Sequence, residues 1–259
     1  MKWAIITGAS SGIGKALAFE FAAGNFDLLI TGRNETALNE VARECSVKYS
    51  VQTEIVVADL SCVDGIDKLV RTITSKPHPY AALVNNAGFG IHGDFASTDI
   101  EENIRLLHVQ LDAALKLTRV VLPGMIQHKT GRILNIASVY SFSPVPFQSV
   151  YAACKAFLLS FSSSLQNELT GTGVTVTVFC PGVTQTEFRS RAGIRQKRTD
   201  TGMTAADVAR IAFRETMRGT HVVVPGLANR AFVWAARLVP PQSMSALVRF
   251  INRQRGQSQ

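Results

Sequence analysis

The stretch TGASSGIG, residues 7–14, continues an apolar run that begins at Ala4 and opens what reads as a helix. Its glycines, at positions 8, 12 and 14, let the backbone N–H groups of a helix N-terminus approach a pyrophosphate that side chains would keep away. A glycine-rich turn alone is a weak indication. Between a strand and a helix it is typical of a dinucleotide-binding fold, so the remaining question is whether strands and helices alternate along the chain.

Short β-branched runs recur along the chain at lengths typical of strands. They lie at residues 4–7, 28–31, 54–58, 82–85, 132–137, 174–179 and 221–225. Most are continuously apolar, as expected of parallel strands covered on both faces, and helix-length segments separate them. One of these segments carries a helical stripe of Leu38, Val41, Ala42 and Cys45. We therefore predict an α/β fold, a single Rossmann-type doubly wound parallel sheet of about seven strands with helices on both faces.

Length and composition suit one domain without a membrane span. The chain has 259 residues, and no run of about 18 apolar residues interrupts it. No charged and apolar leader precedes the first strand, so we expect no signal peptide and a cytoplasmic protein. The four cysteines lie far apart and form no CxxC. This spacing argues against a disulfide framework and against a zinc site, and no metal is predicted.

The net charge of +8 is concentrated near the end of the chain, where no acidic residue follows Glu215. We assign residues 1–226 to a nucleotide-binding catalytic domain and 227–259 to a basic extension of it, two short helices split by Pro240 and Pro241. The segment 187–203, EFRSRAGIRQKRTDTGM, has little periodicity. It is interpreted as a mobile lid over the substrate, with basic residues at Arg189, Arg191, Arg195, Lys197 and Arg198.

Several further motifs follow in order: ADL at 58–60, NNAG at 85–88, Ser138, a Tyr151/Lys155 pair and PG at 181–182. With these motifs, the chain from residue 1 to about 225 resembles the classical short-chain dehydrogenase/reductase family. In that family too a serine precedes the tyrosine by thirteen positions. The resemblance implies hydride transfer between a nicotinamide nucleotide and a carbonyl or alcohol. Dimers and tetramers are common in the family, so a homo-oligomer is expected.

Tyr151 and Lys155 are one helical turn apart and share a face. Taken alone, the pair could be a half-buried tyrosine beside a snorkelling lysine. A free phenol titrates near 10, and the ammonium together with a nicotinium charge would lower that pKa toward about 7. We therefore interpret Tyr151 as general acid/base and Lys155 as its electrostatic partner. The resemblance adds a contact of Lys155 with the nicotinamide ribose, and Ser138 would hold the substrate carbonyl.

One position departs from the family pattern. The family commonly places an asparagine in the helix after the fourth strand, where it holds a water for proton relay. Aligning the run LHVQLDAALKLTRVVLP, residues 107–123, puts Gln110 there. Its amide is displaced by roughly 1.5 Å through the extra methylene, so Gln110 is a doubtful fourth catalytic member.

The end of the second strand indicates the cofactor. Gly32 stands where the family has an acid that binds the adenosine ribose, and Arg33 follows. A guanidinium there can grip a 2′-phosphate, which favours NADP(H), unless Arg33 is only a solvated loop residue. The resemblance implies cofactor contacts from Gly8, Ser10, Ser11, Gly12, Ile13, Gly14, Arg33, Asp59, Leu60, Asn86, Ala87, Gly88, Tyr151, Lys155, Pro181, Gly182, Val183, Thr184 and Thr186.

The candidate pocket walls are mostly apolar: Phe89, Ile91, His92, Tyr140, Phe142, Val145, Phe147, Val183 and Phe188. They favour a hydrophobic ketone and its secondary alcohol as substrates, although several could pack in the core instead. His92 is interpreted as a rim residue rather than a base, since Tyr151 fills that role.

Two other functions stay open. The basic lid would suit a 3-oxoacyl reductase acting on acyl carrier protein or coenzyme A thioesters. A non-catalytic regulator that senses NADP(H) is the alternative of another class, and Gln110 leaves it some room.

The apolar stripe of the tail, Met244, Leu247, Val248 and Ile251, could cover the pocket, pack against another subunit or lie peripherally on an anionic membrane. No nucleic-acid binding is expected, because no recognition motif accompanies the positive charge.

Overall fold

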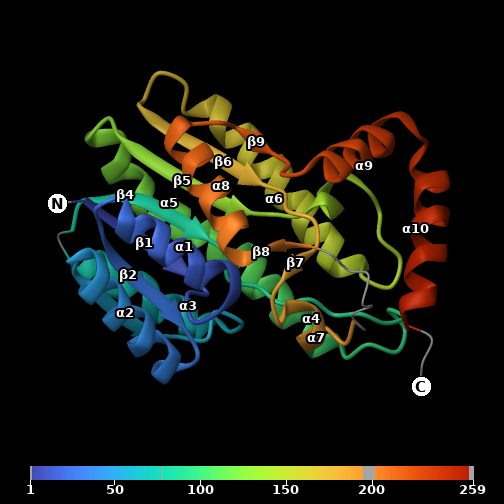
Figure 1. Cartoon of the computed structure of the whole chain (residues 1–259), viewed down its shortest axis with the longest axis horizontal. Helices are drawn as coiled ribbons and strands as arrows, with labels where there is room; N and C mark the ends of the chain where they lie inside the picture. Colours follow the sequence, from blue (N-terminus) through green and yellow to red (C-terminus); the bar gives the residue numbers. More distant parts are fainter. Residues whose placement is uncertain (1, 77, 195–201, 257–259) are drawn as a thin grey trace.

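The computed structural model describes residues 2–76, 78–194 and 202–256, with side chains up to residue 250. In chain order (Figure 1) the elements are β1 (Lys2–Thr7), α1 (Gly12–Ala23), β2 (Phe26–Gly32), α2 (Glu35–Tyr49), β3 (Thr53–Val57), α3 (Val63–Ser75), β4 (Tyr80–Asn85), α4 (Ile100–Leu107), a π-helical turn η1 (His108–Asp112), α5 (Ala113–Gln127), β5 (Gly131–Ile136), a 3-10 turn η2 (Val139–Phe142), α6 (Ser149–Glu168), β6 (Val174–Phe179), β7 (Thr184–Gln185), α7 (Phe188–Arg191), β8 (Met203–Thr204), α8 (Ala205–Arg218), β9 (Val222–Val223), α9 (Leu227–Leu238) and α10 (Pro241–Gly256).

The seven predicted strands form one parallel sheet in the order β3-β2-β1-β4-β5-β6-β9. The strand order reverses between β1 and β4, so the crossovers on the two sides of this point pass over opposite faces of the sheet. The predicted Rossmann-type doubly wound sheet is thereby confirmed. Such a reversal opens a crevice at the carboxyl ends of the strands, where ligands bind in this architecture.

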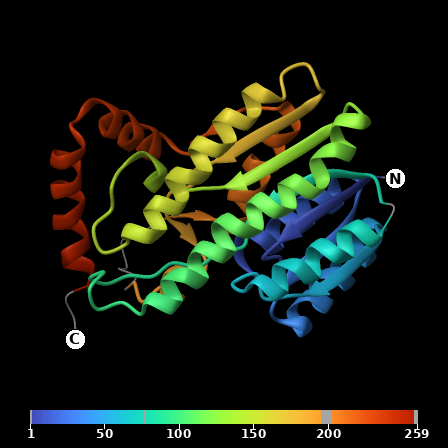
Figure 2. The same ribbon diagram turned by 180° about the vertical axis from the view of Figure 1, so that it is seen from behind.

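Helices cover both faces of the sheet, as Figures 1 and 2 show from opposite sides. Helices α1, α2 and α8 pack on one face, where Leu17, Phe21, Leu38, Val41 and Val208 share a core cluster with the strands. On the other face, α3, α5 and α6 bury Leu69, Leu117, Val121, Cys154 and Leu165. The strand residues are apolar on both sides because both faces are dry.

The interpretation of 187–203 as a loop of little structure is wrong in two places. Phe188–Arg191 form the short helix α7, and Met203–Thr204 form β8, which pairs in parallel with β7 (Thr184–Gln185). The ring of Phe188 lies 5.6 Å from that of Tyr151 and holds this segment against α6. Arg195, Lys197 and Arg198 of the predicted lid lie outside the described residues.

The tail forms two helices at the predicted proline break. Pro241 is the first residue of α10, where the missing N–H is no loss because helix N-termini leave such groups unpaired. Met244 and Val248 are buried with Val145 and Ala152, while Leu247 is exposed, and the side chain of Ile251 lies outside the described residues. Within residues 2–256, apart from the undescribed gaps, no helix is both long and apolar enough to cross a membrane.

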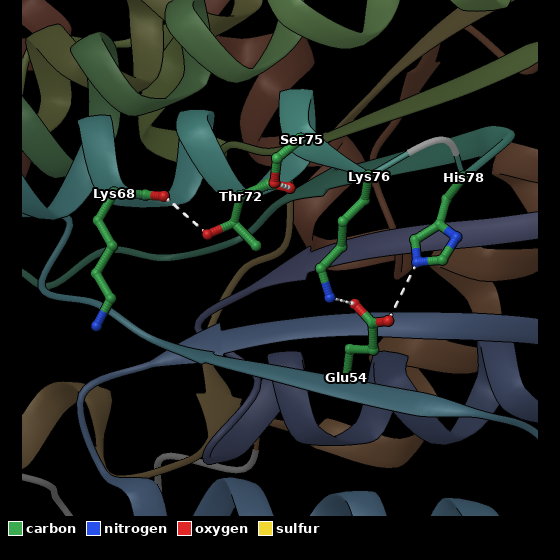
Figure 3. A network of polar contacts seen from close by, with 6 residues as sticks. All are labelled: Glu54, Lys68, Thr72, Ser75, Lys76 and His78. Carbon is green, nitrogen blue, oxygen red and sulfur yellow. Dashed lines mark hydrogen bonds and ion pairs between the residues drawn. The ribbon is translucent and has the colours of Figure 1, made fainter.

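A polar cluster lies at the end of the sheet where the strands β3 and β4 begin (Figure 3). The carboxylate of Glu54, in β3, accepts from Lys76 Nζ and pairs with His78 Nε2 at 3.1 Å. The His78 ring also stacks on Trp3, with centroids 3.9 Å apart. Burial acts to raise the pKa of Glu54, but the hydrogen bonds and charges of Lys76 and His78 outweigh it and hold that pKa below its usual value.

Replacing Glu54 with Gln should therefore destabilise the protein in a pH-dependent way. A carboxylate whose pKa is lowered by folding stabilises the fold above its unfolded pKa of about 4.3, and this contribution is lost as pH falls through the folded value. We expect a loss of up to about 1 kcal/mol at neutral pH, measured by urea unfolding, and a smaller loss near pH 3. Glu102→Gln, which breaks the exposed pair with Arg105, is the control with a smaller expected effect. A difference that is the same at both pH values would contradict this account.

Candidate active site

A cavity of about 820 Å³ lies at the carboxyl ends of the strands, on the side where the order reverses. The loops after β1, β2, β3, β4, β5 and β6 all contribute to its lining. Every residue predicted for catalysis or for cofactor contact lines this cavity, with the single exception of Gln110. The structure thus brings together motifs that are as much as 178 positions apart, from Gly8 to Thr186.

The glycine turn is a cradle that side chains would fill. A Cβ at Gly14 would lie 2.1 Å from the Gly8 carbonyl oxygen, and Gly8 itself has a φ of +68°. Across the cradle, the methyl carbon of Thr186 would lie 3.2 Å from a Cβ at Gly12. The first turn of α1 therefore presents its N–H groups to the cavity, and the turn fits the phosphates of a dinucleotide.

The buried hydroxyl of Thr7 ties this turn to the NNAG motif. It donates to the Val84 carbonyl at 3.1 Å and accepts from the N–H groups of Asn86 and Ala87, both at 2.9 Å. The Asn86 amide returns a bond to the Thr7 carbonyl at 2.8 Å. These bonds hold the two sides of the nucleotide crevice at a set separation.

The end of β2 offers a guanidinium to the cavity. Arg33 lines it and makes no hydrogen bond or ion pair with another described residue. Nearby, Asp59 accepts from the N–H and the hydroxyl of Ser61, at 3.0 and 2.7 Å. Burial acts to raise the pKa of Asp59, but these bonds and the charge of Arg33 bring it below its usual value. Asp59 thus accepts its hydrogen bonds from Ser61 and not from Arg33, so the Arg33 guanidinium can bind an anion.

Ser138, Tyr151 and Lys155 are all buried and line the same cavity. Ser138 follows β5, and the other two lie on one face of α6. Lys155 Nζ donates to the Ile136 carbonyl at 2.7 Å and lies 5.5 Å from the centre of the Tyr151 ring. The carbonyl at the end of β5 thereby holds the ammonium under the phenol.

Burial moves both titratable groups toward their neutral forms. It raises the pKa of Tyr151 above its ordinary value, although a hydrogen bond with Ser138 opposes this, and it lowers the pKa of Lys155 to about 8. Near neutral pH the phenol therefore keeps its proton while the lysine is mostly charged. The protein alone therefore raises the pKa of Tyr151, and the predicted lowering would need the charge of a bound cofactor.

Gln110 does not line the cavity but supports its wall from behind. It lies buried in the π-helical turn η1, between α4 and α5, and its Nε2 donates to the Phe89 carbonyl at 3.1 Å. A Cβ at Gly88 would come within 3.2 Å of the Gln110 amide carbon. The glutamine therefore packs directly against the end of the NNAG motif, and its role in proton relay stays a prediction.

The predicted pocket walls divide into two groups. Phe89, His92, Tyr140, Val183 and Phe188 line the cavity. The other four do not line it: Ile91, Phe142, Val145 and Phe147. Val145 packs with Met244 of α10, and the Phe142 ring lies 5.4 Å beneath the Arg237 guanidinium. Phe142 and Val145 thus face the tail, whose position no local pattern reveals, whereas the Phe147 ring lies 6.1 Å from that of His92.

A model of the short chain dehydrogenase family matches residues 2–197. The chain belongs to this family. It is 34% identical over 229 residues to sulfoacetaldehyde reductase 2 of Chromohalobacter salexigens, covering 85% of this chain and 90% of that one. It is 33% identical over 191 residues to the very-long-chain 3-oxoacyl-CoA reductase of Mus musculus, covering 72% and 61%.

Among solved structures, a short-chain dehydrogenase from Sphingobium yanoikuyae in complex with NADPH superposes with a TM-score of 0.83. The two share 30% identity over 100% of this chain and 98% of that one. The protein is therefore a short-chain oxidoreductase of alcohol and carbonyl groups that uses a nicotinamide nucleotide. This confirms the fold, the family and the general chemistry expected from the sequence.

The dehydrogenase also has cavity residues that the motifs did not indicate. Gln148 is buried three positions before Tyr151, and its side-chain amide has no hydrogen-bond partner among the described residues. Its i, i+3 spacing from Tyr151 could have indicated it. Asn229, Phe232 and Val248 line the cavity from α9 and α10. Val248 belongs to the apolar tail stripe for which covering the pocket was one expectation, whereas Asn229 and Phe232 carry no local signal and reach the cavity only through the packing of the tail.

Gln110→Leu should cost about 1–3 kcal/mol of folding free energy, because it leaves the Phe89 carbonyl without its donor. The matched control is Gln185→Leu, which removes an amide-to-carbonyl bond of 2.9 Å to Gly202 at an exposed position and should cost much less. Thermal unfolding of both variants measures the difference. Equal losses would contradict the supporting role given to Gln110.

Proposed function

We propose that this dehydrogenase uses NADP(H) to interconvert a hydrophobic ketone and its secondary alcohol. The observation that carries the proposal is the convergence of Ser138, Tyr151 and Lys155 on the cavity that also holds the glycine cradle. A reacting carbonyl placed there meets hydroxyl donors from both Ser138 and Tyr151. The bound nicotinamide nucleotide supplies the hydride in reduction and accepts it in oxidation.

The protonated phenol of Tyr151 and the charged ammonium of Lys155 suit reduction of a carbonyl. As the hydride reaches the carbonyl carbon, the oxygen gains negative charge and takes the proton of Tyr151, whose raised pKa has kept it in place. Ser138 would donate to the same oxygen and so stabilise the developing charge. The ammonium of Lys155 then stabilises the phenolate that is left, since it lies beneath the ring. Oxidation runs the same steps backward.

The apolar lining supports a bulky hydrophobic substrate. Besides the catalytic groups, the substrate side of the cavity is walled by Phe89, Tyr140, Val183, Phe188, Phe232 and Val248. Two of these come from the tail. We accordingly propose that residues 1–226 form the cofactor-binding catalytic domain and that 227–259 complete its substrate wall as an extension of the same domain.

A 3-oxoacyl thioester of coenzyme A or acyl carrier protein is the second candidate. The likeness to a 3-oxoacyl-CoA reductase favours it, and so do Arg189 and Arg191 in the cavity wall. The Gln148 amide precedes α6, lines the cavity and has no partner among the described residues, so it could donate to the thioester carbonyl of such a substrate. Arg191 is paired with Glu187, which weakens the attraction for an anionic carrier. A regulator without turnover gains no support from the three catalytic groups.

Tyr151→Phe should lower turnover by about 10²–10⁴-fold, because it removes the proton donor. The measurement is NADPH oxidation across hydrophobic ketones and 3-oxoacyl thioesters, with free acyl carrier protein as competitor in the second set. Tyr140→Phe is the matched control, since its ring lies 6.5 Å from that of Tyr151 and also lines the cavity. Equal losses in both variants would contradict the role of Tyr151. NADPH binding without turnover of any carbonyl would favour the regulator.

Arg33→Ala should weaken NADPH binding by about 10–100-fold and leave NADH binding nearly unchanged, because a charge-assisted bond to the 2′-phosphate is worth about 1.5–3 kcal/mol. Dissociation constants from nucleotide fluorescence test this directly. Arg43→Ala, in α2, controls for loss of one positive charge. If the binding of NADPH and of NADH weakens equally, Arg33 does not bind the 2′-phosphate.

A further inference from the structure

The outward face of α9 is an apolar stripe that nothing in the described chain covers. Leu227, Trp234 and Leu238 are 82%, 63% and 79% exposed. Their spacing of seven and four positions brings them onto one helix face. Large apolar side chains grouped in this way on a protein surface mark a contact with another molecule or a membrane.

The inner face of the same helix is already used. Val233 is buried, Phe232 and Ala236 pack against the cluster of Val145, Ala152, Met244 and Val248, and Phe232 also lines the cavity. The stripe therefore points away from the body of the protein. On α10, which packs through Met244 and Val248, Leu247 and Phe250 are likewise exposed, at 56% and 65%. Figures 1 and 2 show both helices at the periphery of the molecule.

The charged residues of α9 and α10 all have one sign. No acidic residue follows Glu215 in the sequence. Arg230 and Arg237 lie on α9 and Arg249 on α10, and within the described residues none of the three forms an ion pair. The Arg230 Nε donates to the Val224 carbonyl instead, and Arg237 lies over the Phe142 ring. No carboxylate within the described part of the chain pairs with these three guanidinium groups.

This charge pattern selects among the possible occupants. A second copy that docked through the same face would set arginines against arginines, with no carboxylate on either tail to pair with them. An anionic lipid surface supplies phosphate groups to the arginines and an apolar layer to the leucines. Trp234, which lies between the two leucines of the stripe, also suits the boundary between head groups and acyl chains.

We propose that α9 and α10 dock this protein peripherally on an anionic bilayer, with Leu227, Trp234 and Leu238 entering the interface. The docking does not depend on which carbonyl compound is the substrate. One consequence does rest on the proposed function. Because Asn229, Phe232 and Val248 of the same helices line the cavity, its wall adjoins the docking surface, and a substrate dissolved in lipid would have a short path to Tyr151.

The chain offers its own spectroscopic probe. Of its two tryptophans, Trp3 is buried against His78, whereas Trp234 is exposed on the stripe. The full-length protein should sediment with vesicles of equimolar phosphatidylcholine and phosphatidylglycerol, with a blue shift of tryptophan emission that persists in Trp3→Phe. Binding should weaken as salt is added and be far weaker to phosphatidylcholine alone. No sedimentation with either vesicle, or equal binding to both, would overturn the proposal.

Matched variants separate the apolar and the charged contributions. Leu227→Ser with Leu238→Ser should weaken vesicle partitioning at least tenfold, whereas Val47→Ser, at an equally exposed site on α2, should not. Arg249→Glu should weaken it roughly fivefold or more, and Arg43→Glu much less.

Retained NADPH binding by each variant shows that it is folded, so failure of docking is distinguishable from failure of the enzyme. A blue shift that grows with protein concentration in the absence of lipid, accompanied by dimers in sedimentation analysis, would assign the stripe to a second copy instead.

Discussion

One buried hydroxyl, that of Thr7, sets the distance between the two halves of the nucleotide crevice. It satisfies the Val84 carbonyl and two consecutive N–H groups at the end of β4. Without it the buried Val84 carbonyl and the two part-buried N–H groups would each lose a partner, which costs more than the bonds themselves are worth. Because β1 and β4 flank the reversal of strand order, the glycine cradle and the NNAG motif both take their positions from this residue.

The groups proposed for catalysis show a second constraint, which is burial. Burial keeps Tyr151 protonated and lowers the pKa of Lys155 to about 8, so near neutral pH the lysine ammonium is the main charge between these two groups. A charge that a ligand brings into such a site acts in a medium of low polarity and is felt strongly. The Ile136 carbonyl keeps the lysine within reach of the phenol while satisfying one of its three donors.

The sequence alone could predict those parts of the molecule whose signals are local. The seven strands are short β-branched runs, and the motif residues follow strand ends, so their order along the chain was enough to bring them to one edge of the sheet. Phe142 and Val145 were misassigned because they face the tail rather than the substrate. The helix α7 was missed because a single turn is too short to show a helical period. Oligomeric state and location in the cell stay predictions.

The contact between helix α9 and the loop after β6 has a consequence for protein engineering. Asn229 of α9 sits so close to Gly182 that a Cβ there would lie 2.2 Å from its side-chain oxygen, and the same amide is fixed by a bond to the Pro225 carbonyl. The tail is thus interlocked with the loop after β6. A chimaera that takes α9 from another dehydrogenase must transplant the loop that faces it as well, since the two surfaces fit only as a pair.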